Sequence, residues 1–189
     1  MASSSNTPPP AIGFLTVVEE PSQGLVGGYL LLNSAGRPLE FHCTTPVNAN
    51  RPQQILYGAA LLPYLYGEQI GQALVAKGRS APRLICTDVA PALSVRDFSA
   101  TPVALVVGID PKLNDREGEQ FVAKVMSAAR CREIGRGETW RAGLPLAHEK
   151  DAEPTNSALG TLAADFDLAE PFERIREALH EMQAGSRAA

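Results

Sequence analysis

The chain has 189 residues, of which 44% are hydrophobic and 20% are charged, and its formal net charge at pH 7 is -4. This length suffices for one domain with a full core, whereas two separate cores would each be small. The negative net charge argues against a general nucleic-acid binder, because contacts with phosphates need a basic face. We therefore expect no nucleic-acid partner.

The start of the chain is rich in Ser, Asn and Pro, and we expect residues 1–11 to form a disordered tail. It lacks the basic start and the apolar stretch of a signal peptide, and no later segment has the apolar length of a membrane span. The three cysteines are an odd number without the spacing of a disulfide framework, which fits a reducing compartment. These features predict a cytoplasmic protein with no membrane partner.

Three strands are predicted after this tail. Residues 12–20 alternate in the manner of a strand, and residues 26–32 and 38–45 are two further strand-like runs joined by a turn that contains Asn and Gly. Along the third run, the period of two places Cys43 on the apolar face and His42 on the opposite face. Consecutive strands with short connections favour an antiparallel meander.

A long apolar helix is expected over residues 51–77, where apolar side chains recur at spacings of three and four. Pro63 interrupts this run and predicts a kink or two shorter helices that meet there. Two almost entirely apolar runs follow, residues 84–86 and 103–109, and they are typical of strands covered on both faces. A second helix is expected near residues 115–131.

The last part of the chain is expected to divide into two segments. Residues 135–166 are rich in Gly, Pro and charge and predict an irregular connection after a core domain of residues 12–134. Residues 167–185 predict a C-terminal amphipathic helix, centred on residues 171–184. This helix either docks on its own core or binds a partner.

Together these elements predict an α/β (α+β) fold. Its sheet is mixed but largely antiparallel, begins with a three-strand meander, and packs against one long apolar helix and two further helices. The order of elements is similar in architecture to profilin-like and roadblock-like scaffolds, and this analogy favours a binding or adaptor role.

Thiol, imidazole and carboxylate groups lie near the ends of two predicted strands, at His42, Cys43, Cys86 and Asp88. A soft or borderline metal accepts such ligands, and a Cys86–His42 pair would make a thiol nucleophile. However, His42 and Cys43 point to opposite faces, and the chain has no Cys-x-x-Cys or His-Glu-x-x-His motif. We therefore assign no catalytic residue, metal or cofactor, and buried structural cysteines are the alternative.

Carboxylates also follow the two apolar runs, at Asp88 and Asp110. Ligands commonly bind at the carboxyl ends of strands in open α/β sheets, so these positions are of interest for binding. The alternative is that both are turn residues that end their strands.

Two sets of residues are candidates for binding a partner. Tyr64, Tyr66 and Glu68 cluster in the long helix, with helix-to-sheet packing as the alternative. The apolar face of the terminal helix provides the second set, which is Phe172, Ile175, Leu179 and Met182. The leading hypothesis is a non-catalytic interaction or adaptor module that binds itself or another protein, and the alternative is a small thiol- or metal-dependent enzyme.

Overall fold

The structure is a computed structural model that describes residues 11–21, 23–163 and 165–187. The expected disordered tail lies outside the described residues except for Ala11, which already belongs to the first strand. Among the described residues, no helix is both long enough and apolar enough to cross a membrane.

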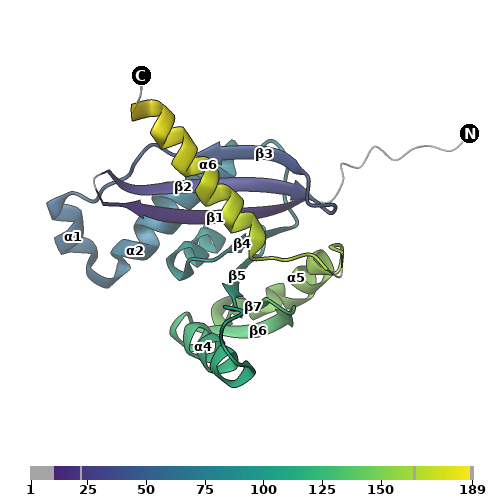
Figure 1. Ribbon diagram of the computed structural model, residues 1–189. Helices are drawn as coiled ribbons and strands as arrows, with labels where there is room; N and C mark the ends of the chain where they lie inside the picture. The colour runs from purple at the N-terminus through teal and green to yellow at the C-terminus, as the bar shows by residue number, and fades with distance from the viewer. Residues whose placement is uncertain (1–10, 22, 164, 188–189) are drawn as a thin grey trace, which may run out of the picture.

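A seven-stranded mixed sheet forms the centre of the molecule, in the order β3-β2-β1-β4-β5-β7-β6 (Figure 1). The first three strands form the antiparallel meander, and β4 and β5 continue the sheet in parallel with β1. Strand β7 then pairs antiparallel with β5, and β6 pairs antiparallel with β7. The strands are β1 (Ala11–Glu20), β2 (Gly24–Asn33), β3 (Pro38–Cys43), β4 (Leu84–Thr87), β5 (Val103–Gly108), β6 (Cys131–Arg136) and β7 (Trp140–Pro145). The predicted fold class is confirmed.

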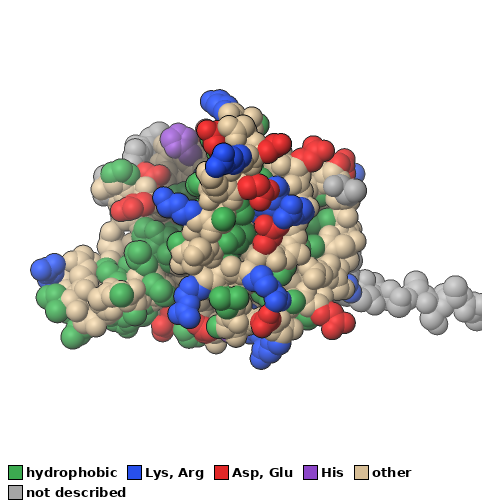
Figure 2. Space-filling model, turned by 90° about the horizontal axis from the view of Figure 1, so that it is seen from below, with side chains coloured by type: hydrophobic (Ala, Val, Ile, Leu, Met, Phe, Trp, Pro, Cys, Tyr) green, Lys and Arg blue, Asp and Glu red, His purple; other side chains and the backbone are tan. Residues whose placement is uncertain are grey.

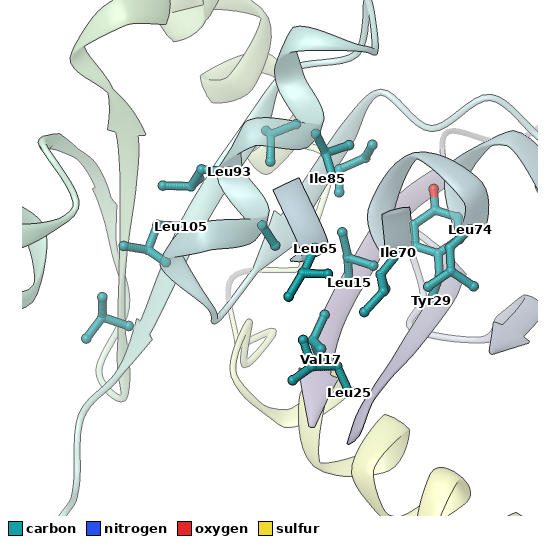
Figure 3. Packing of buried hydrophobic residues seen from close by; sticks show 14 of the residues in the cluster. Leu15, Val17, Leu25, Tyr29, Leu65, Ile70, Leu74, Ile85, Leu93 and Leu105 are labelled. Carbon is teal, nitrogen blue, oxygen red and sulfur yellow. The ribbon is translucent and has the colours of Figure 1, made fainter. Parts of the chain in front are cut away.

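Helical segments cover both faces of this sheet. They are α1 (Arg51–Tyr57), η1 (Gly58–Ala60), α2 (Leu61–Pro63), the π-helix η2 (Tyr64–Gln72), α3 (Ala73–Lys77), η3 (Ala90–Asp97), α4 (Asp115–Ala128), η4 (Leu146–Asp151), α5 (Ala152–Leu159) and α6 (Glu170–Arg187). On one face, η2, α3, η3 and α4 enclose a core that includes Leu15, Tyr29, Ile70 and Leu74 (Figure 3). On the other face, α5 and α6 enclose a second core around Phe14.

The helix expected over residues 51–77 is one helical path with breaks. The helical path changes direction at Gly58, whose φ of 50° lies in the left-handed region that glycine tolerates. After Pro63 the backbone continues as a π-helix, consistent with a proline that disturbs helical hydrogen bonding. The π-helix brings Gly67 against Ser94 and Gly71 against Val95 of η3, so small residues allow the two segments to touch.

Regular elements occupy much of residues 135–166, where we expected an irregular connection. Strand β7 pairs with β5 and β6, and α5 follows η4. The strand pattern is hidden in the sequence because β6 carries charged residues and its pairing with β7 shifts register between Glu133 and Gly135. Pairing with β5 therefore overrides weak local strand preference.

The terminal helix docks on its own sheet. Helix α6 runs across β1 and β2 (Figure 1), and Phe172, Ile175 and Leu179 are buried there. Its approach is close because β2 has glycine beneath it: a Cβ added at Gly28 would lie 2.3 Å from Ile175 Cγ2. This contact fixes the distance of α6 from the sheet.

The edge strand β3 also holds the end of the long helical path. One carboxylate oxygen of Glu40 accepts from the backbone N–H of Arg79 and the other from that of Ser80, both at 2.8 Å, and His42 Nε2 lies 3.1 Å from Glu40 Oε2. These hydrogen bonds, the one from Arg79 above all, lower the pKa of Glu40 to about 2. The carboxylate thus ties the segment after α3 to the sheet.

We predict that Gly28→Ala destabilises the fold by about 1–3 kcal/mol, because the new methyl group forces Ile175 and α6 away from the sheet. Gly108→Ala is the control, since its Cβ would lie 3.5 Å from the Ala169 Cβ, an ordinary contact. Urea unfolding at neutral pH measures both. Equal midpoints for the two variants would contradict the close packing of α6.

We predict that Glu40→Gln lowers the free energy of unfolding by about 1–3 kcal/mol at neutral pH, because the amide cannot accept both backbone N–H groups. The folded pKa of about 2 lies below the ordinary 4.5, so this stabilisation is present above pH 4.5 and is lost as pH falls through 2. Urea unfolding from pH 7 to 2 should show the two curves converge. Glu181→Gln, at an exposed carboxylate on α6, should follow the wild type throughout.

Candidate functional site

The structure does not bring Cys86 and His42 together. They lie on β4 and β3, with β1 and β2 between them, so roughly 14 Å of sheet separates the strands. They also lie on opposite faces: Cys86 packs in the core beneath α6, whereas His42 pairs in register with Tyr29, which belongs to the other core. A thiol–imidazole pair is therefore absent at these residues.

The thiols have no activating surroundings. Cys86 is fully buried, and burial raises its pKa far above the ordinary value. Cys43 is half-buried on the α6 side, with its Sγ 4.0 Å from Met182 Sδ. No group of three or more His, Cys, Asp or Glu side chains suited to a metal ion occurs within residues 11–21, 23–163 and 165–187.

The tyrosine cluster lies in the helical layer on one face of the sheet. The Tyr64 ring stacks on Tyr57 with centroids 4.1 Å apart, and Tyr66 packs partly against the core. Glu68 is half-buried on the same π-helix. Hydrophobic side chains gather at the end of the molecule where Figure 1 places α1 (Figure 2), including Leu56, which is 82% exposed.

The second set of expected binding residues is mostly core. Phe172, Ile175 and Leu179 are buried against the sheet, so they are already satisfied within the chain. Met182, in contrast, is 53% exposed beyond the edge of that core.

Among the residues proposed from the sequence, Asp88 lies at a cavity together with Phe172, whereas Cys43, Leu179 and Met182 line a smaller cavity of about 170 Å³ beneath the end of α6. Asp88 directly follows β4, which runs parallel to its neighbours β1 and β5, so it lies at the carboxyl end of β4, beside the middle of β1 and near the end of β5. Helix α6 carries Arg176 to this point, where its Nη2 donates to Asp88 Oδ2. On the helix itself, Arg176 Nη1 also donates to Glu173 Oε1 at 2.8 Å.

The electrostatics of Asp88 reflect its burial. Desolvation raises the pKa of this carboxyl group, while the hydroxyl of Thr16 on β1 and the charge of Arg176 act in the opposite direction. Its Oδ1 atom is buried and makes no hydrogen bond of ordinary geometry among the described residues, and the nearby Thr16 Oγ1 is likewise buried without a regular partner. A buried carboxylate oxygen without a donor is uncommon in folded proteins and often marks a functional position.

A cavity of about 330 Å³ opens beside this ion pair, between α4 and α6. Its floor is the end of β5, and its walls are mainly apolar. The lining residues are Asp88, Val106, Val107, Gly108, Phe121, Val125, Ala169, Phe172, Glu173 and Arg176. This volume is at the lower end of the range for small-molecule sites, and an apolar wall with a few polar groups is their usual composition.

The arrangement places hydrogen-bond acceptors and donors side by side at one end of an apolar cavity. Asp88 and Glu173 accept, and Arg176 donates in a planar fork. Such a set can recognise the edge of a planar heteroatom-bearing molecule.

Sequence reasoning missed Phe121, Glu173 and Arg176 as site residues. The two α6 residues fall outside the apolar stripe of the amphipathic pattern, where charges are ordinarily solvated. Only the spacing of Glu173 and Arg176 by three residues signalled a pair on one helix face. That this pair also meets Asp88 depends on how α6 crosses the sheet, which local spacing does not reveal.

No protein family and no curated protein matches the sequence. Several solved structures resemble the chain, among them these three. Two are of Ciona intestinalis endonuclease V in complex with DNA that contains an inosine followed by a ribo-adenosine. The variant on a 23-mer shows 13% identity over 91% of this chain and 86% of that chain, with a TM-score of 0.48. The protein on a 24-mer shows 12% identity over 92% and 87%, with a TM-score of 0.48.

The third structure is human ENDOV, which shows 11% identity over 95% of this chain and 86% of that chain, with a TM-score of 0.45. The enzyme name and the DNA belong to those proteins. The expected non-catalytic protein-interaction or adaptor module is not the class to which these structural neighbours belong, since they are a nuclease. The expected lack of a nucleic-acid partner likewise stands against two neighbours that hold DNA. We retain neither expectation.

We predict that Asp88→Asn changes how stability depends on pH. Because the folded pKa of Asp88 is raised above the ordinary 3.8, the native state holds the proton longer, and wild-type stability falls as pH rises between the two values. The limiting slope of this contribution is about 1.4 kcal/mol per pH unit, and the variant lacks it. Urea unfolding from pH 3 to 8 compares the two profiles. Parallel profiles would show that burial does not control this carboxyl group.

Proposed function

We propose that this chain binds a small ligand with a planar, partly apolar body in the cavity beside Asp88. The observation that carries the proposal is a buried, incompletely paired carboxylate at the end of an apolar cavity, at the carboxyl ends of β4 and β5. The apolar walls would hold the body of the ligand, and the Asp88–Arg176–Glu173 group would hold its polar edge.

The walls suit a flat molecule. Phe121 on α4 is 45% exposed, so its ring is available for stacking, whereas Phe172 is already buried in the core. Val106 and Val107 at the end of β5 close the floor. A ligand in this place would bury apolar area and still present one edge to the charged residues.

A nucleobase is the ligand of this class that we propose to test first. It is planar, it stacks on aromatic side chains, and it presents neighbouring donors and acceptors along one edge. The base could be free, in a nucleoside or in a nucleic-acid strand. Binding of a small ligand replaces the adaptor role that we expected from the sequence. Such binding depends on one local cavity and needs no basic face for phosphate contacts.

The test is a titration followed by NMR. Adenosine, cytidine, guanosine, uridine and a short single-stranded DNA are each added to the full chain. We expect saturable shifts of the signals of Val106, Val107 and Phe121 with at least one of them, because these residues line the cavity.

Two variants with a new bulky side chain sharpen this test. Val125→Trp fills the cavity from α4 and should weaken binding at least tenfold, whereas Leu113→Trp lies outside the lining and should leave binding unchanged. The proposal fails if no probe gives a saturable shift at the cavity, or if Val125→Trp binds as tightly as the wild type.

A further inference from the structure

Arg176 bridges two carboxylates that differ in their surroundings. Its Nη2 donates to Asp88, whose side chain is 15% exposed, and its Nη1 donates to Glu173, whose side chain is 70% exposed. Arg176 itself is 37% exposed. The guanidinium therefore lies between a buried partner and a solvated one, at the mouth of the cavity.

Glu173 gives Arg176 a second partner on its own helix. Because the two residues are three positions apart on α6, their ion pair is local and does not depend on the sheet. Arg176 can therefore leave Asp88 and keep a carboxylate partner in contact with water. Asp88 has no such alternative, because no other basic side chain in the described part of the chain forms an ion pair with it.

Any ligand that separates this pair must supply donors to Asp88. A buried carboxylate left without a partner is strongly unfavourable, and Asp88 Oδ1 already lacks a donor of ordinary geometry. The ionisable groups that line the cavity are two carboxylates and one guanidinium, so their combined formal charge is -1 when all are ionised. The site thus favours a ligand edge that donates hydrogen bonds, neutral or cationic, over one that accepts them.

We infer that the ligand of this cavity carries an amidine-like pair of N–H donors that replaces the Arg176 guanidinium at Asp88, while Arg176 remains on Glu173. This inference rests on the proposed function and specifies the polar edge of the ligand. Guanidines, amidines and the amino-bearing edges of heterocycles belong to this class, because each presents two N–H groups to one carboxylate.

Benzamidine, benzamide and benzoate provide a matched series of probes. All three have the same ring and nearly the same size, but the edge changes from donors only, to one donor and one acceptor, to acceptors only. We expect benzamidine to bind at least tenfold more tightly than benzamide, and benzoate to show no saturable binding. NMR signals of Val106 and Phe121 report occupation of the cavity, and the Arg176 side-chain N–H signals report its displacement.

Two variants place the selectivity on Asp88. Asp88→Asn should weaken benzamidine binding at least tenfold and remove its preference over benzamide. Glu170→Gln is the control, because Glu170 pairs with Arg174 on the same helix and does not line the cavity, and it should leave the benzamidine affinity unchanged. The wild-type series alone is decisive if Asp88→Asn does not fold.

The outcomes separate this inference from the proposed function. Tighter binding of benzoate than of benzamidine would overturn the inference, because the ligand would then replace Asp88 at Arg176. Equal binding of all three probes at the cavity signals would also overturn it, while the cavity would stand as a ligand site. If neither these probes nor the nucleosides shift the cavity signals, both statements fall.

Discussion

The close contact of α6 with β2 determines where the chemistry of this protein lies. Gly28 has no side chain to separate the helix from the strand, so Ile175 rests directly on the sheet. The next residue along the helix is Arg176, which reaches the end of β4 and meets Asp88. A helix held farther from the sheet would leave Asp88 without its guanidinium partner, so a packing constraint in the core sets the geometry of the ion pair at the rim.

The fold was largely accessible from the sequence because its strongest signals are local. Alternation and turn residues revealed the meander, and continuous apolar runs revealed the strands that are covered on both faces. Strand β7 was not accessible, because a bulge near Gly135 and its charged partner strand break the pattern of two. The π-helix after Pro63 was foreseen only as a kink, since its contacts with η3 are long-range.

The candidate site also has one part that the sequence indicates and one part that only the structure reveals. Asp88 was noted from the sequence because it follows an apolar strand, and the strand direction places it at a sheet edge where ligands bind. Its proximity to Arg176 joins residues 88 positions apart, which no spacing rule predicts. The Cys86–His42 pair, which was considered from the sequence but not adopted, does not form: the strands that carry the two residues lie three positions apart in the sheet, because the meander places β3 at the far edge.

The net charge of -4 led to the expectation of no nucleic-acid partner, but net charge does not decide whether a protein can bind a single base. Net charge governs binding that depends on many phosphate contacts. A cavity that takes a single base depends instead on stacking and on a few hydrogen bonds to one edge of that base. Figure 2 shows acidic and basic side chains interspersed over one face rather than gathered by sign. Recognition by this chain would therefore depend on the edge of one ligand at Asp88, whatever the charge of the whole molecule.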